Sequence, residues 1–177
     1  MMYVQLGATP EHDFDQPLGL LSDCHRRIEH FLGVLLKVAR EAPDDQLSEP
    51  YGRALEVALT YFREAAPKHT QDEEESLFPR LRRAGCQHQA LNLLEADHQE
   101  AETMHFMVEG LATLWLADGQ LEVAQRALLV ATLSKLERLY AEHIQLEDTG
   151  LFPLAAALLE ADQLADIGRE MARRRGL

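Results

Sequence analysis

Cysteine, long apolar runs and strand-like alternation are scarce or missing in this sequence of 177 residues. Its two cysteines, Cys24 and Cys86, build no disulfide framework, so a reducing, cytoplasmic setting is the default expectation. No apolar run approaches the roughly 18 residues that a membrane-spanning helix needs. The N-terminus also lacks the basic and apolar regions of a secretory signal. We therefore expect a cytoplasmic protein that does not cross a membrane.

Basic residues are also few, with 17 Lys and Arg against 30 Asp and Glu, and the formal net charge is −13. Nucleic acids and anionic membranes are bound by clustered Lys and Arg, so neither is expected as a partner. The one basic cluster, Arg173 to Arg175, closes a predicted helix, where positive charge interacts favourably with the helix dipole. An apolar content of 46% in a chain of this length fits one domain with a substantial core.

Apolar residues recur at helical spacing through most of the chain, and no segment has the period of a strand. The predicted helices cover residues 18–41, 51–84, 87–116, 120–147, 151–160 and 163–174, with a loop at 42–50. Pro67 and Pro79 are expected to kink or break the second helix, and residues 148–150 to interrupt the fourth. Four long helices joined by short loops predict an all-α, up-down-up-down four-helix bundle. We expect a lead-in segment at 1–16, the bundle at 17–160, and a short C-terminal helix of the same domain at 161–177.

One polar phrase occurs twice in this predicted bundle. It reads His, three residues, Glu, four residues, Phe-Pro, and its copies begin at His69 and His143. Each copy is preceded by another histidine in a similar setting, His25 in the first half and His98 in the second. The copies are offset by 74 residues and the preceding histidines by 73. The chain therefore contains an internal duplication of a helical hairpin.

The polar residues shared by the two halves are metal-ligand types. Residues four apart lie on one helical face, so each phrase presents its imidazole and its carboxylate, Glu73 or Glu147, in the same direction. With His25 and His98, the set offers four imidazoles and two carboxylates, which suits a pair of first-row cations in a bundle core. Two six-coordinate ions have about twelve positions, and bridging groups leave about one open on each ion. Such a centre suits dioxygen, peroxide or nitric oxide.

A histidine and a glutamate four residues apart are also an ordinary contact on a helix surface. His105 and Glu109 show this spacing without a repeat partner, so the pair alone is weak evidence. The duplication and the Leu-Phe-Pro tail of both copies favour metal binding. Phe78 and Phe152 in that tail are expected to wall the site and keep it apolar.

Other residues near the phrases have less specific signals. Glu102 and Glu29 follow the third- and first-helix histidines by one turn. They are candidates for an additional ligand or for an acceptor that orients a histidine. Glu74 belongs to an acidic run, usually a solvated face, although it could help guide cations. His105 is expected at the edge of the core or on the surface, and Tyr140 in the core.

The order and spacing of these residues resemble the hemerythrin-like, HHE cation-binding domain family over about residues 15–159. The resemblance implies a four-helix bundle with two iron ions in a non-haem, oxo- or hydroxo-bridged centre, with manganese or zinc as possible substitutes. The implied ligands are His25, His69, Glu73, His98, His143 and Glu147, and the two glutamates bridge. Oxygen-carrying hemerythrins have a histidine where this chain has Glu102 and an aspartate where it has Glu147. The set is more similar to bacterial HHE proteins linked to iron–sulfur cluster repair and to nitric oxide or oxidative stress.

We therefore expect a metal-binding protein whose di-iron centre binds or reduces small oxygen or nitrogen species in a stress response. The expected partner is a diatomic or peroxide ligand, and an exposed apolar helix face would support a homodimer. Two alternatives stay open. The same centre without turnover would serve an oxygen, redox or iron sensor or an iron-handling module. A structural bundle would hold zinc or no metal.

Overall fold

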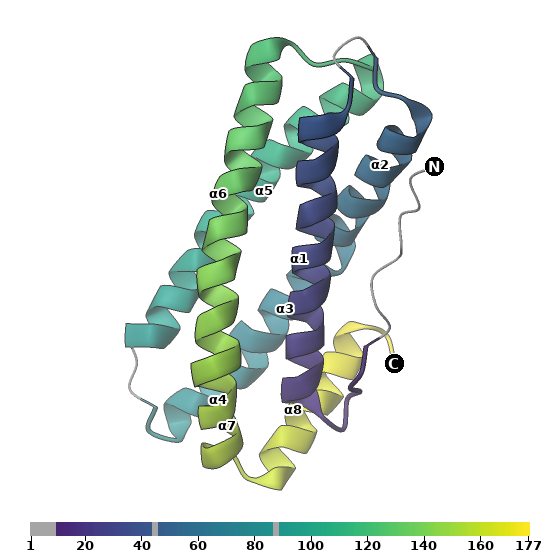
Figure 1. Cartoon of the computed structure of the whole chain (residues 1–177). Helices are drawn as coiled ribbons and strands as arrows, with labels where there is room; N and C mark the ends of the chain where they lie inside the picture. Colours follow the sequence, from purple (N-terminus) through teal and green to yellow (C-terminus); the bar gives the residue numbers. More distant parts are fainter. Residues whose placement is uncertain (1–9, 44–45, 87–88) are drawn as a thin grey trace.

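The computed structural model describes residues 10–43, 46–86 and 89–177, and every regular element in these ranges is helical (Figure 1). In chain order the elements are α1 (Pro17–Glu41), α2 (Glu49–Glu64), α3 (Ala66–Gln71), η1 (Asp72–Leu77), α4 (Phe78–Arg83), α5 (Gln89–Asp118), α6 (Val123–Leu146), η2 (Glu147–Leu151), α7 (Phe152–Leu158) and α8 (Ala161–Arg174). The two elements named η are short π-helical segments. No helix in these ranges is long and apolar enough to cross a membrane. Residues 1–9 of the expected lead-in lie outside the described residues, as do the first two residues of the third predicted helix.

The long helices pack around a common interior. α1 contacts α2 and α6, and α5 contacts the same two helices, which closes the arrangement into a bundle. Figure 1 shows α1 and α6 side by side, with α5 behind them and the α3 and α4 stretch near the end that carries α7 and α8. The predicted all-α class is confirmed for the part of the chain that the structure describes.

Two apolar clusters fill the bundle. One lies among α1, α2, α5 and α6 and includes Trp115 and Leu133. The other joins the first turns of α1 and α5 to α4, α7 and α8, and includes Phe78 and Met171. Along each of α1, α5 and α6, a histidine stands between the residues of the two clusters. The fold thereby holds a polar layer between two apolar layers.

The second helical stretch differs from the single helix predicted over 51–84. α2 begins at Glu49, and Pro50 occupies its first turn, where a missing backbone donor costs nothing. The stretch is interrupted before Pro67 and widens into η1 before Pro79, so the expected breaks at both prolines are confirmed. A proline ring clashes with the carbonyl four residues earlier in an α-helix, and a π-helical turn relieves this clash.

The fourth predicted helix also has different ends. α6 begins at Val123 rather than at 120, because a capping box between Glu122 and Gln125 satisfies its first donors. The predicted interruption at 148–150 was wrong, since these residues lie in η2 and stay helical. The wider turn accommodates Pro153 in the same way as in the first copy, so no break is needed.

The C-terminal helix α8 begins two residues earlier than predicted, because a capping box forms at its N-terminus. It packs against α1 and η1. Arg80 of α4 donates two hydrogen bonds to the Glu170 carboxylate of α8, at 2.8 and 2.9 Å. Arg174 and Arg175 lie 2.9 and 2.7 Å from the buried carboxylate of Asp72. α8 therefore holds the segment η1 in place.

Candidate metal centre

The six residues that the sequence singled out lie in one buried layer, and each comes from a different element. They are His25 of α1, His69 of α3, Glu73 of η1, His98 of α5, His143 of α6 and Glu147 of η2. The two glutamate side chains are fully shielded from solvent, and the histidine side chains are at most 8% exposed. In both phrases the histidine stands on an α-helix and the glutamate on the π-helical segment that follows.

The ligand-type atoms of these residues gather in two groups that share both glutamates. The first group is His25, His69, Glu73 and Glu147, and the second is Glu73, His98, His143 and Glu147. In each group the four atoms lie within 4.8 Å of one another. Glu73 places Oε1 3.2 Å from His69 Nε2 and Oε2 3.3 Å from His98 Nε2, so its carboxylate faces both groups. Glu147 Oε2 lies 3.1 Å from His25 Nε2 and 3.3 Å from His143 Nε2.

Two of the histidines have a carboxylate on Nδ1, the ring nitrogen that faces away from the two glutamates. We call these carboxylates the outer carboxylates. His25 Nδ1 lies 3.0 Å from Asp148 Oδ1, and His98 Nδ1 lies 2.8 Å from Glu74 Oε1. Asp148 and Glu74 directly follow the glutamates of the two phrases, so the duplication repeats this contact across the bundle. A carboxylate on Nδ1 fixes the ring orientation and leaves Nε2 as the inward atom.

The other two histidines differ from each other. His143 Nδ1 lies 3.3 Å from Asp97 Oδ2. His69 Nδ1 is buried and makes no hydrogen bond with a described residue. The duplication places Cys24 at the position equivalent to Asp97, and its buried thiol is a weaker hydrogen-bonding group than a carboxylate. The two groups therefore have the same inner residues but unequal outer support.

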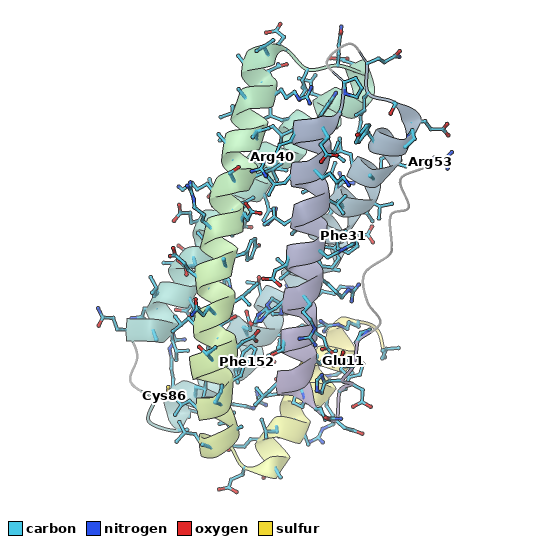
Figure 2. The ribbon with its side chains drawn as sticks, viewed as in Figure 1. Glu11, Phe31, Arg40, Arg53, Cys86 and Phe152 are labelled. Atoms are coloured by element: carbon cyan, nitrogen blue, oxygen red, sulfur yellow. The ribbon has the colours of Figure 1, made fainter. Side chains whose placement is uncertain are left out.

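Aromatic rings from the two Phe-Pro tails cover the layer. Phe152, labelled in Figure 2, stacks on the ring of His25 with 5.5 Å between centroids. Phe78 stacks on His98 with 6.2 Å between centroids. Both phenylalanines are buried. They lie where the sequence predicted apolar walls, and they limit the access of water to the polar layer.

The buried carboxylates change the proton affinity of the histidines beside them. Burial lowers the pKa of His25, but the neighbouring carboxylates, Asp148 first, outweigh burial and raise the pKa to about 12. The same balance raises the pKa of His98 to about 9. Burial dominates at His69 and lowers its pKa to about 3. At Glu73 burial raises the pKa, but the surrounding imidazoles, His69 first, outweigh it and hold the pKa well below its ordinary value.

The donor set can be tested against a bound cation. All four carboxylate oxygens of Glu73 and Glu147 are buried and make no hydrogen bond with a described residue, and the same holds for His25 Nε2. Buried polar atoms without hydrogen bonds are rare because their desolvation is costly. Imidazole and carboxylate are donors that first-row cations accept, and a cation between them would satisfy these atoms. The residues present therefore fit a metal-binding site.

A cavity of about 320 Å³ adjoins this layer. The four histidines line it, together with the apolar side chains of Ile28, Phe62 and Ile144. Its wall also contains His105 and Tyr140, whose Nε2 and Oη atoms lie 2.9 Å apart. A small molecule in this cavity would face the same imidazoles that face the two glutamates.

The carboxylates that contact the Nδ1 atoms of the histidines are those of Asp148, Glu74 and Asp97. Glu102 and Glu29 are exposed, and neither belongs to the two groups, although Glu102 lines the cavity. On α1 and α5 the residue one turn after the histidine is exposed, whereas each acceptor comes from an element packed against that histidine. The available signal was the acid that follows the glutamate in both copies, Glu74 and Asp148. No comparable signal marks Asp97.

Comparisons with known proteins place the same residues inside one domain. The hemerythrin HHE cation-binding domain matches residues 16–155, which contain all six candidate ligands. An uncharacterized protein of Haemophilus influenzae is 31% identical over 170 residues, which cover 92% of this chain and 91% of that protein.

Proposed function

We propose that this chain, which belongs to the hemerythrin HHE cation-binding domain family, holds two iron ions and binds or reduces small oxygen or nitrogen species. The observation that carries the proposal is the pair of buried groups that share Glu73 and Glu147 beside a cavity. A shared carboxylate is the natural bridge between two cations. We also propose an up-down-up-down order for the four long helices, with residues 161–177 as part of the same domain as 17–160.

In this proposal the chain supplies the inner ligands and their support. The ligands are His25, His69, Glu73, His98, His143 and Glu147. Bound iron would provide redox and Lewis-acid chemistry to a small molecule in the cavity. Four imidazoles, two bridging carboxylates and one bridging oxide or hydroxide would leave about one position per ion for such a molecule. The outer carboxylates fix the orientation of the imidazole rings, and the side chains of Phe78 and Phe152 limit water in the layer.

The first test is the metal content of protein purified from iron-supplemented cells, with its visible spectrum before and after anaerobic reduction and oxygen addition. Two irons per chain and an absorption band that bleaches on reduction and returns with oxygen would support the proposal. Glu102→Gln is the matched control, because it removes an exposed carboxylate from the cavity wall and should load the same iron. Substoichiometric metal, or zinc with a featureless spectrum, would contradict it.

Reactivity is tested separately on the loaded protein. Oxygen, hydrogen peroxide and nitric oxide are added one at a time, and the spectrum and the consumption of each reagent are followed. Consumption at a constant rate indicates turnover, and one equivalent taken up without turnover indicates binding. A loaded protein that responds to none of the three would refute the proposed ligand class.

A second candidate function, a sensor without turnover, is favoured by the contact between α8 and η1. Asp72 directly precedes Glu73, and its buried carboxylate is held by Arg174 and Arg175. A change at Glu73 on metal or ligand binding would therefore act on the C-terminal helix through one peptide unit. Hydrogen exchange of α8 with and without iron tests this function. Protection of α8 that is independent of iron would exclude this route of signalling.

A further inference from the structure

His105 and Tyr140 form a hydrogen-bonded pair in the cavity wall that the proposed ligand set does not use. His105 stands on α5 and Tyr140 on α6, and His105 Nε2 lies 2.9 Å from Tyr140 Oη. Both side chains are half-buried and both line the cavity with the four candidate histidines. The sequence predicted that they lie in the core or on the surface, whereas the structure places both in the wall of the cavity.

The duplication shows that this pair is no part of the repeated metal-holding framework. The offset of 73 residues places Leu32 at the position equivalent to His105. The offset of 74 residues places Ala66 at the position equivalent to Tyr140. The six candidate ligands obey the two-fold repeat, whereas the pair breaks it. A hydrogen-bonding pair is therefore present on only one side of the repeat.

Both members of the pair are neutral at pH 7. Burial lowers the pKa of His105 to about 4, so its imidazole carries one N–H. Burial and the negative charge of Glu73 raise the pKa of Tyr140, so its phenol stays protonated. When His105 Nε2–H donates to the Tyr140 oxygen, the phenol O–H is left to donate into the cavity. Tyr140 lines the same cavity as the four candidate histidines, so the phenol and the candidate ligands face one space.

The other parts of the cavity wall are less suited to hold a small ligand. Ile28, Phe62 and Ile144 are apolar, and Gln71 and Gln99 are exposed and therefore hydrated. Two carboxylates in the wall, those of Glu74 and Glu102, repel negative charge. With the proton of His105 on Nε2, the phenol O–H offers a fixed donor in a wall whose other polar groups are the candidate histidines, two exposed amides, two carboxylates and the hydroxyl of Thr70.

We propose that Tyr140 donates a hydrogen bond to the exogenous ligand of the centre and that His105 is the residue that positions its hydroxyl group. This inference rests on the proposed function and specifies its ligand: a small oxygen or nitrogen species with a lone pair that faces the cavity wall. Tyr140 touches the ligand, whereas His105 acts through Tyr140.

The experiment titrates azide, as the probe, into iron-loaded protein and follows the visible spectrum. Tyr140→Phe removes only the hydroxyl group. A hydrogen bond to a charged acceptor contributes about 1.5–3 kcal/mol, so the dissociation constant of azide should rise by about tenfold or more, with iron content unchanged. Tyr61→Phe is the matched control, because Tyr61 is a buried tyrosine of the same bundle that does not line the cavity. It should leave the azide affinity unchanged.

Two variants test the positioning role of His105. His105→Gln retains an amide N–H that can reach the phenol oxygen, and it should restore most of the azide affinity that His105→Phe loses. Both variants should load wild-type amounts of iron, since His105 is outside the two groups. Equal loss in both variants would overturn the positioning role.

The outcomes separate this inference from the proposed function. If the wild-type protein loads two irons and binds azide, and Tyr140→Phe binds azide with the same affinity, the inference is overturned and the proposed function stands. Tyr140→Phe that loads less iron than Tyr61→Phe assigns the pair a structural role and also overturns it. Wild-type protein that takes up no iron overturns both. Iron-loaded wild-type protein that binds no azide overturns the inference alone, because the proposed function is tested with oxygen, peroxide and nitric oxide.

Discussion

Replacement of Asp148 by asparagine tests whether the outer carboxylates support metal binding. Asp148 accepts from His25 Nδ1 at 3.0 Å and from the Ser22 hydroxyl at 2.7 Å. Asp148→Asn removes the negative charge and keeps the shape, and the amide oxygen still accepts from Nδ1–H. Only the electrostatic support of His25 is therefore lost.

The magnitude follows from two opposing effects. Loss of an outer partner typically weakens metal binding by about 10–100-fold. The Asp148 side chain is 33% exposed, so solvent screens part of its charge. The same charge also raises the pKa of His25. Its removal therefore lowers the affinity of His25 for the proton that competes with a metal ion, and this partly offsets the loss of metal affinity. We expect the lower end of the range, about tenfold, or about 1.4 kcal/mol at one of two sites.

Competition with a chelator of known affinity, under anaerobic conditions with ferrous iron, measures this effect. Asp148→Asn should weaken one of the two binding steps, and Glu74→Gln should weaken the other, because the two carboxylates support histidines of different groups. Glu29→Gln is the control with the same change of charge at an exposed position. Affinities equal to that of the control would refute the reasoning, and so would equal weakening of both steps by one variant.

Three further predictions concern the glutamate bridge, the C-terminal helix and the core. Glu73→Gln should abolish the binding of two ions per chain, because both groups share this carboxylate, and metal analysis after gel filtration measures the ratio. Glu170→Gln should lower the free energy of unfolding at pH 7 by about 1 kcal/mol. Arg80 lowers the pKa of Glu170, so this stability is present above the ordinary pKa near 4.5 and is lost as pH falls through the folded value; urea melts of both proteins should converge below that pH. Leu133→Ala should lower the free energy of unfolding by about 2–5 kcal/mol in urea melts, because Leu133 is buried in the apolar cluster among α1, α2, α5 and α6. Its metal stoichiometry should not change, because this cluster is separate from the layer of the two glutamates. A lowered stoichiometry would contradict that separation.

Local patterns in the sequence were sufficient for the class of the fold and for the six residues that the structure brings together in one buried layer. Helical periodicity depends on residues three and four apart, so it predicted the helices within a few residues of their observed ends. The duplication gave the six inner residues, because a repeat of ligand-type side chains at one spacing constrains two helices at once. The prolines at 67 and 79 predicted where the second stretch breaks, because a missing N–H acts on its own helix. The continuation of the fourth stretch through η2 was missed, since the sequence signal for a π-helical turn is weak.

Tertiary structure decided which residues support that site. The contact between His25 and Asp148 joins residues 123 positions apart, and the contact between His143 and Asp97 joins residues 46 apart. Such contacts depend on the rotation and register of each helix against its neighbours, and a period along one helix carries no information about either. For the same reason, the sequence did not predict the hydrogen bond between His105 and Tyr140 or the contacts of Arg174 and Arg175 with Asp72. The sequence by itself determined which side chains could bind a metal and on which face of each helix they stand. The packing of the helices alone decided which carboxylates hold the rings and which wall of the cavity offers a donor.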